Sequence, residues 1–211
     1  MRHATVCNRC LRNAAIAATV SFTLAMLAAC SLSRIGAYST PSEHQRNPLE
    51  AQRLTQKAAA QMNEEPDSAE SLLREALRAD LYHGPAHNNL GVLLLKKKDL
   101  YGAANEFEWA RKLMPGHPDP RVNLALTLER AGRTDEAMKT YEAALDVYPG
   151  YMPAIEAVTR LLVRRGSGAG ADRHMTYSEE ELRANLSEIA MRGSSERWRR
   201  WATEQLAKGD R

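Results

Sequence analysis

The sequence has few cysteines and few aromatic residues, and it lacks a net charge once its first 29 residues are set aside. Of 211 residues, three are cysteine and 6% are aromatic. The first 29 residues hold Arg2, Arg9 and Arg12 and no acidic residue, so removing three from 29 basic residues leaves 26, equal to the 26 acidic ones. A formally neutral chain gives no sign of the localised basic face expected for nucleic acid binding.

The first 29 residues are predicted to be a signal peptide and not part of the fold. Their arginines precede an apolar run from Ala14 to Ala29, and a basic stretch followed by an apolar one is typical of secretory signals. The run is too short and too rich in alanine to indicate a permanent membrane span. Cys7 and Cys10 lie in this segment, and without a second ligand pair we expect no metal site there.

Residues 27–30, LAAC, resemble the lipobox of bacterial lipoprotein precursors. The resemblance implies cleavage before Cys30 and lipidation of its thiol with acyl chains such as palmitate, and two or more chains give stable anchoring. Ser31 follows the cysteine, which in such precursors favours the outer membrane facing the periplasm. The alternatives are an ordinary secretory signal with Cys30 incidental, or an uncut signal anchor. With the other two cysteines removed and this one acylated, no disulfide is expected in the mature monomer.

Residues 30–49 are predicted to be a flexible tether. They include SLSRIGAYSTPSEHQRN, which has no hydrophobic period and is rich in serine, threonine and proline. A flexible segment of this size holds the next domain roughly 20 to 25 Å from the anchor on average.

A repeating pattern of residue types occupies most of residues 50–165. At one constant offset similar residues recur in pairs: Leu90 and Leu124, Gly91 and Ala125, Ala103 and Ala137, Phe107 and Tyr141, Ala110 and Ala144, Pro115 and Pro149. The offset is about 34 residues, and these spacings resemble the tetratricopeptide repeat, a helix-turn-helix unit of this length. The resemblance implies an all-α fold in which hairpins form a short right-handed α-solenoid. The expected units are 50–83, which is degenerate, 84–117, 118–151 and a half-repeat at 152–165.

The repeat pattern also predicts how each hairpin packs and where it ends. Small residues are needed where the two helices cross, so Gly91 or Ala125 is expected to meet Ala103 or Ala137. The recurring prolines cannot extend a helix and are expected to close each unit. Thr134 is a candidate N-cap for the helix that follows it.

The C-terminal region is predicted to hold two further helices after a glycine-rich linker at 166–177. Within residues 178–211, Ser178 and Glu181 have the spacing of a capping box, and an apolar stripe continues to about Arg192. A second helix begins at about Ser195 and carries two tryptophans. We expect these helices to cap the solenoid, although arginine beside tryptophan also suits a lipid interface.

No motif in the sequence indicates catalysis. His83 and His87 have the spacing of a zinc pair, but Gly84 and Pro85 between them indicate a helix start, so a surface or packing role is expected. GSGAGA at 166–171 lacks the lysine and hydroxyl of a phosphate-binding loop and follows no strand. We therefore expect a protein that is not an enzyme, with no cofactor, no metal and no small-molecule substrate.

What remains is a binding surface for another protein or peptide. The resemblance implies that the first helices of successive units line a groove. Its candidate residues are Asn88, Asn89, Val92, Lys96, Val122, Asn123, Leu126, Arg130, Glu156, Arg160 and Arg164. Asn88 stands where a carboxylate-clamp repeat has lysine, which argues against such a clamp. Arg160 and Arg164, one turn apart, are expected to form a positive end that favours an acidic or mixed helical segment, or else a solvated charge pair.

Taken together, these features predict a lipid-anchored, helical-repeat scaffold of the bacterial cell envelope. The chain resembles small tetratricopeptide lipoproteins that assist assembly of envelope machines such as type IV pilus secretins. An accessory regulator of a cell-wall enzyme is the alternative, and a catalyst whose site forms only in the fold is a third. Fold alone does not decide between them.

Overall fold

The computed structural model describes residues 46–166 and 177–209, which fold only into helices and the turns between them. The predicted signal peptide, Cys30, most of the tether and most of the glycine-rich linker lie outside the described residues. All described helices belong to one compact unit, Pro41–Arg211. None of them has both the length and the apolar character that crossing a bilayer requires. The predicted all-α fold is confirmed.

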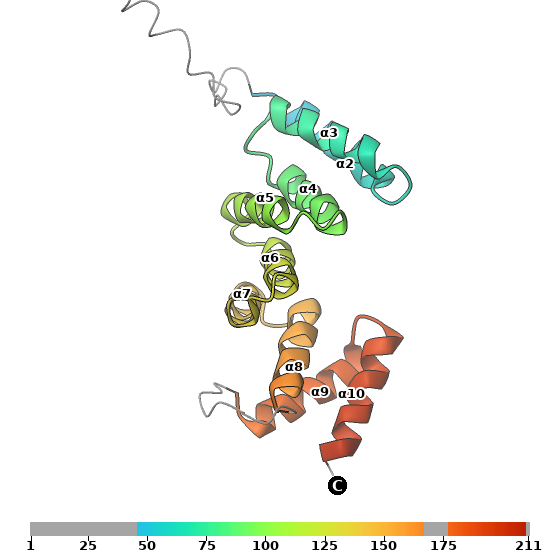
Figure 1. Cartoon of the computed structure of the whole chain (residues 1–211), viewed down its shortest axis with the longest axis vertical. Helices are drawn as coiled ribbons and strands as arrows, with labels where there is room; N and C mark the ends of the chain where they lie inside the picture. The colour runs from blue at the N-terminus through green and yellow to red at the C-terminus, as the bar shows by residue number, and fades with distance from the viewer. Residues whose placement is uncertain (1–45, 167–176, 210–211) are drawn as a thin grey trace, which may run out of the picture. The chain divides into compact units, whose positions relative to one another are not determined.

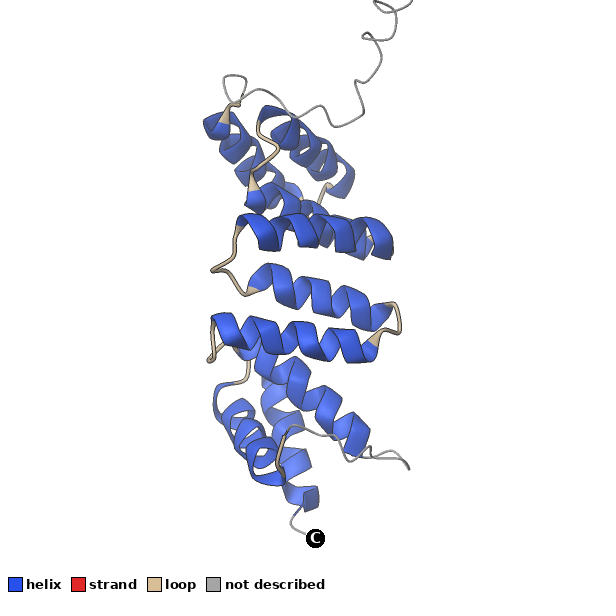
Figure 2. Cartoon of the chain, turned by 90° about the vertical axis from the view of Figure 1, so that its left-hand side faces the viewer, coloured by secondary structure: helices blue, strands red, loops and turns tan. Residues whose placement is uncertain are grey.

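Nine helices follow one another in the described ranges (Figure 1). In chain order they are α2 (Pro48–Gln61), α3 (Pro66–Ala79), α4 (Gly84–Lys96), α5 (Leu100–Leu113), α6 (Asp119–Arg130), α7 (Thr134–Val147), α8 (Met152–Gly166), α9 (Glu179–Arg192) and α10 (Glu196–Gly209). Three hairpins pair α2 with α3, α4 with α5 and α6 with α7, and the second helix of each packs on the first helix of the next element. The hairpins therefore stack in sequence order (Figure 2), as in an α-solenoid.

Proline and capping side chains set where most of these helices begin. Proline occupies one of the first two positions of α2, α3, α4 and α6, where its missing N–H leaves no bond unmade. Asn47 caps α2 by accepting from the Glu50 N–H, and Asp99 caps α5 by accepting from the Gly102 N–H. Helices α5 and α7 end two residues before a proline, as the repeat pattern predicts.

The predicted N-cap at Thr134 is wrong. Thr134 is the first residue of α7, and Arg133 occupies the cap position without a side-chain bond to the backbone. The Arg133 guanidinium instead pairs with Glu136 in the first turn. The turn itself sets the helix start, because Gly132 adopts a φ of 79° and the Arg133 N–H donates to the Leu128 carbonyl.

A continuous apolar core runs through the stacked hairpins and into α8. Leu73, Leu90, Phe107, Tyr141 and Leu161 come from five helices of the stack, α3, α4, α5, α7 and α8, and all are almost completely buried in it. Because each hairpin contributes to the same core, no hairpin buries its apolar face alone.

Gly91 lets α4 and α5 approach closely, but its nearest neighbour differs from the expected one. A Cβ placed on Gly91 would lie 2.6 Å from the ring of Phe107. The absence of a side chain at Gly91 therefore makes room for this aromatic ring and not for Ala103. The fully buried ring has no room to retreat.

The C-terminal helices pack onto the last helix of the repeats. The predicted capping box is present, since the Glu181 N–H donates to Ser178 Oγ and the Ser178 N–H donates to the Glu181 carboxylate. Helix α9 packs on α8, and its Leu182 reaches the main core. Helix α9 thus supplies α8 with the second-helix partner that the sequence directly after α8 lacks.

Helix α10 closes this end through its tryptophans. Trp198 and Trp201 meet edge to face with ring centroids 5.3 Å apart, and both are half-buried. They pack on a second apolar cluster formed by Ile155 of α8 with Leu186 and Ile189 of α9. This packing supports the capping interpretation over the lipid interface, because α8 and α9 already cover part of the apolar face of α10.

Candidate partner-binding surface

The residues predicted to line a groove all lie on the first helices of successive units. Four are on α4, four on α6 and three on α8: Asn88, Asn89, Val92, Lys96, Val122, Asn123, Leu126, Arg130, Glu156, Arg160 and Arg164. Helices α4 and α6 contact each other directly, so their eight residues share one surface. Those on α8 behave differently from one another.

The amides on α4 and α6 bind each other in part. Asn123 Nδ2 donates to Asn88 Oδ1 at 3.1 Å, which links the two helices across their interface. Asn89 is half-buried and makes no side-chain hydrogen bond to any described residue. Of the three predicted amides, Asn89 therefore keeps its full capacity to donate and accept.

Apolar side chains lie beside these amides. Val92 on α4, with Val122 and Leu126 on α6, are half-buried and pack against the main core from its outer side. Their remaining accessible area gives this face an apolar strip. A partner that covers the strip gains about 25 cal/mol for each Å² of apolar surface removed from water.

Arg160 differs from the expectation of a free cation. It forms a two-pronged ion pair with Glu129. Arg160 Nη1 and Nη2 donate to the two carboxylate oxygens of Glu129 at 2.7 and 2.8 Å. The Arg160 guanidinium holds the pKa of Glu129 below its usual value, although partial burial opposes the shift. Arg164 approaches the same carboxylate only at 3.5 Å, and its side chain is 56% exposed. The positive charge at this end is therefore carried by Arg164.

Glu156 does not line an open groove, and its prediction as a contact residue is wrong. Glu156 is only 3% exposed, because the turn between α9 and α10 lies over it. The carboxylate accepts from the Ser194 N–H at 2.5 Å and from the Ser194 hydroxyl at 2.8 Å. Glu156 thus fastens the C-terminal helices to α8.

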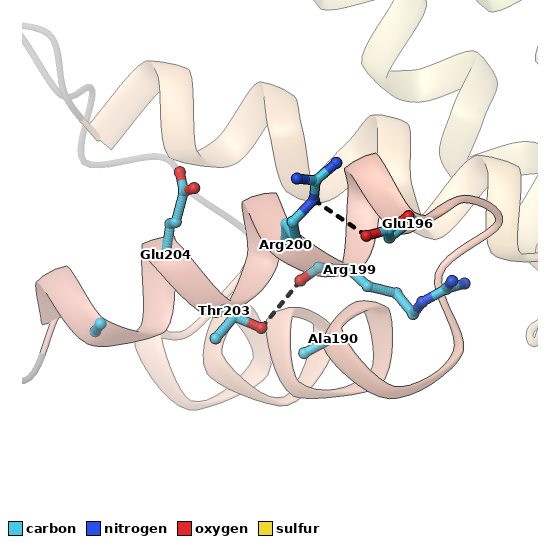
Figure 3. Close-up of a pocket in the computed structure, with 7 residues that line it drawn as sticks. Ala190, Glu196, Arg199, Arg200, Thr203 and Glu204 are labelled. Atoms are coloured by element: carbon cyan, nitrogen blue, oxygen red, sulfur yellow. Dashed lines mark hydrogen bonds and ion pairs between the residues drawn. The ribbon is translucent and has the colours of Figure 1, made fainter.

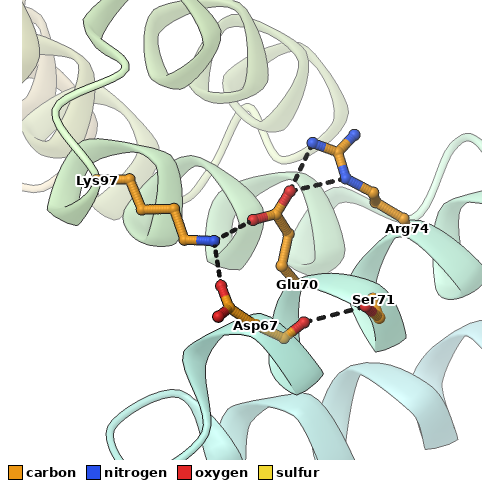
Figure 4. Close-up of polar contacts among 5 residues, drawn as sticks. All are labelled: Asp67, Glu70, Ser71, Arg74 and Lys97. Carbon is orange, nitrogen blue, oxygen red and sulfur yellow. Dashed lines mark hydrogen bonds and ion pairs between the residues drawn. The ribbon is translucent and has the colours of Figure 1, made fainter.

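Two ionic contacts between helices were missed by the sequence reasoning. Lys97 Nζ binds Asp67 at 2.6 Å and Glu70 at 2.7 Å, which joins α4 to α3 (Figure 4). Arg165 pairs with Asp135 in the same way at the other end of the stack. A signal was present, because the Lys97–Asp67 and Arg165–Asp135 pairs both have a spacing of 30 residues.

Both ring nitrogens of His87 are engaged by other groups of the protein, as expected for a packing role. Its ring is buried, with Nδ1 2.6 Å from a Glu106 carboxylate oxygen and Nε2 2.8 Å from the Leu81 carbonyl. Trp109 stacks on the ring at 5.6 Å. His83 sits at the N-cap of α4, as the glycine and proline after it indicate. Across the described ranges, histidine, cysteine and acidic side chains nowhere gather in threes that could hold a metal ion.

A shallow hollow on α10 offers no assembled site. Its floor is Ala190 of α9, and its polar groups come from α10 (Figure 3). Several of those groups already bind nearby residues: Thr203 Oγ1 donates to the Arg199 carbonyl, and Arg200 lies 3.7 Å from Glu196. The face formed by α4, α6 and the end of α8 is therefore the better candidate surface.

Stacked helical hairpins that present amide, apolar and basic side chains on their first helices define a helical-repeat scaffold. Two family models, each described as Tetratricopeptide repeat, match residues 57–108 and 94–162. The chain belongs to the tetratricopeptide repeat family, which confirms the resemblance in the repeat spacing. No curated protein matches the sequence.

Solved structures show the same fold at low sequence identity. The pilF structure from Pseudomonas aeruginosa has a TM-score of 0.59 and 20% identity, over 71% of this chain and 64% of that chain. The first repeat domain of RPAP3 bound to the HSP90 peptide SRMEEVD has a TM-score of 0.55 and 18% identity, over 58% of this chain and 98% of that chain. An O-GlcNAc transferase from Thermobaculum terrenum has a TM-score of 0.57 and 21% identity, over 68% of this chain and 26% of that chain.

Membership of the tetratricopeptide repeat family supports a scaffold for protein–protein interaction. The RPAP3 domain is seen with a peptide bound, so the same fold holds a short segment of another protein there. Tetratricopeptide repeats are typically non-catalytic interaction modules, although one similar chain belongs to a transferase. At these identities the similarity shows the fold alone.

Proposed function

We propose that this protein is a lipid-anchored scaffold that holds another protein at the bacterial cell envelope. The observation that carries the proposal is the surface on α4 and α6, where Asn89 has unused hydrogen-bonding capacity beside half-buried Val92 and Leu126. A surface that is rigidly held by a continuous core, partly apolar and incompletely hydrogen-bonded suits an extended segment of a partner.

The anchor in this proposal is Cys30 in the LAAC sequence. Acylation of its thiol and amino terminus would hold the protein in the outer membrane, facing the periplasm, through chains that each contribute about 0.8 kcal/mol per buried methylene. The test is metabolic labelling with palmitate in cells expressing the chain. Labelling of the wild type and its loss in Cys30→Ser is the expected result, whereas equal labelling of both would place any lipid elsewhere.

The partner in this proposal is a component of an envelope machine under assembly, such as a type IV pilus secretin. Support comes from the fold shared with pilF of Pseudomonas aeruginosa together with the lipobox. Regulation of a cell-wall enzyme would use the same surface, so the identity of the captured protein decides between the two.

Site-directed photo-crosslinking in intact cells tests this function. A photoreactive residue replaces Leu126 on the candidate surface, and a matched variant carries it at Lys139, which is exposed on α7. Capture of secretin or pilus subunits from position 126 and not from position 139 is expected. Capture of wall synthases or hydrolases would instead establish the regulatory function, and equal capture from both positions would exclude this surface.

A further inference from the structure

Three basic residues occupy the same register in three successive first helices. Lys96, Arg130 and Arg164 lie in the last turns of α4, α6 and α8, and each is one repeat length from the next. All three side chains are exposed. We call these three residues the basic column.

Contacts between neighbouring helices show that the basic column is continuous. Arg164 Nη1 lies 3.5 Å from Glu129, the residue before Arg130. Arg130 Nη1 in turn lies 3.5 Å from the carbonyl of Leu95, the residue before Lys96. Arg164 thus contacts the turn that carries Arg130, and Arg130 contacts the turn that carries Lys96. The three charges therefore lie side by side along the stack.

The column keeps its charge, whereas adjacent cations are neutralised. Arg160 takes both oxygens of Glu129, and Lys97 is held between Asp67 and Glu70. By contrast, Lys96 and Arg130 bind no carboxylate in the described part of the chain; Lys96 Nζ donates to the side-chain carbonyl of Asn63 at 3.0 Å. The helix dipole favours a cation at each of these helix ends, but it does not require Lys96 and Arg130 to lie without a close carboxylate. Arg164 shares the Glu129 carboxylate with Arg160, at the longer distance of 3.5 Å.

The groups beside the basic column indicate which anionic partner fits. Asn89 keeps its hydrogen-bonding capacity, and Val92 and Leu126 are half-buried beside it. A protein segment supplies backbone groups for Asn89 and apolar side chains for Val92 and Leu126, together with carboxylates for the column. Charge alone would suit a phospholipid headgroup equally well, whereas this combination favours a protein segment.

We propose that the basic column binds an extended acidic segment of the partner protein, and this inference rests on the proposed function. Packed helices lie about 8 to 10 Å apart, a distance that a segment in the polyproline II conformation covers in one turn of about three residues. Every third side chain of such a segment points the same way, so carboxylates at every third position would meet successive cations. Apolar residues between them would lie against Val92 and Leu126, and Asn89 would bind the segment's backbone.

Fluorescence anisotropy with the full chain in nonionic detergent tests the column directly. The probe is a labelled peptide of about ten residues with glutamate at every third position and serine and valine between. The triple variant Lys96→Gln, Arg130→Gln, Arg164→Gln should bind it about tenfold more weakly than wild type, as expected for the loss of three exposed ion pairs. A peptide with glutamine in place of glutamate should bind wild type as weakly as the variant binds the acidic probe.

A matched control separates the column from net charge. The triple variant Lys112→Gln, Lys139→Gln, Lys208→Gln removes the same charge from exposed sites on other helices and should bind the probe like wild type. Equal weakening in both triple variants would overturn the proposal. So would unchanged probe binding in the column variant, or a column-dependent difference seen only with phosphatidylglycerol vesicles, which would assign the column to a membrane.

The crosslinking experiment distinguishes failure of this inference from failure of the proposed function. If the column variant still captures the envelope partner from position 126 at the wild-type level, the scaffold function stands and the acidic segment is wrong. If the wild type captures no envelope partner, the proposed function fails even when the acidic peptide binds through the column.

Discussion

At the scale of single residues, the two tight turns within the hairpins show how one backbone conformation is met by different side chains. Lys98 and Gly132 occupy the same position in successive repeats, and both have positive φ, at 66° and 79°. The left-handed region costs a residue with a Cβ about 1 to 2 kcal/mol, whereas glycine adopts it freely. Only one of the two equivalent turns therefore carries this strain.

Exchanging these residues should change stability in opposite directions. Gly132→Ala should cost about 1 kcal/mol, or about 2 to 4 °C in Tm for a domain of this size. No atom lies within 4 Å of a Cβ at this position, so crowding does not contribute. Lys98→Gly should raise Tm slightly, because relief of strain exceeds the entropy cost of glycine. Gly116→Ala, equally uncrowded and without positive φ, is the control. Thermal unfolding by circular dichroism measures all three, and a stable Gly132→Ala would contradict the argument.

At the scale of helices, the sequence predicts the repeats well because their packing is encoded in local residue size. Leu90, Ala103 and Phe107 are matched one repeat later by residues of similar size, and the helices they form are buried as that pattern requires. Spacing on a helix also correctly predicts the capping box at Ser178, because both of its bonds are made within one turn.

Contacts between distant helices could not be predicted in the same way. The register of α8 correctly places Glu156 on the first-helix series, yet the turn that covers it comes from beyond the glycine-rich linker. Similarly, the sequence predicts a free cation at Arg160, because its partner Glu129 lies 31 residues earlier on another helix. The contacts of Glu156 depend on how α9 and α10 pack on α8, and those of Arg160 depend on how α6 packs near α8. No local sequence pattern contains this information.

Helix α10 should depend on the buried carboxylate of Glu156. In Glu156→Ala the Ser194 N–H and hydroxyl lose their acceptor, and such a loss costs about 1 to 3 kcal/mol. Hydrogen exchange should rise in α10 and the last turn of α9 while the amides of α4 and α5 stay protected. Glu188→Ala, which removes the partly exposed partner of Arg192, should leave exchange unchanged. Faster exchange spread over the whole chain would show that Glu156 has no such local role.

At the scale of the whole molecule, the stacked hairpins depend on their interfaces, since each repeat contacts only its neighbours. The ionic contacts are distributed along the stack: Lys97 joins α4 to α3, Glu129 joins α6 to α8, and Arg165 of α8 pairs with Asp135 of α7. Among the carboxylates of these contacts, that of Glu129 is the most buried, at 11% exposure. Acid should therefore weaken the link between the third hairpin and α8 through this residue.

The pH dependence of stability should identify Glu129 as that link. Its pKa is lowered in the folded protein, chiefly by the hydrogen bonds from Arg160 and against the effect of burial. A carboxyl group with a lowered pKa stabilises the fold fully above its unfolded pKa of about 4.3, and this contribution is lost as pH falls through the folded value. Glu129→Gln should therefore cost about 2 kcal/mol at pH 7, with a gap to wild type that closes as the pH falls below about 4. In the control Glu136→Gln the exposed pair with Arg133 is removed, and stability should hardly change at either pH. Urea unfolding across this pH range gives both values, and a gap that stays constant in acid would show that Glu129 is not ionised or not paired in the folded protein.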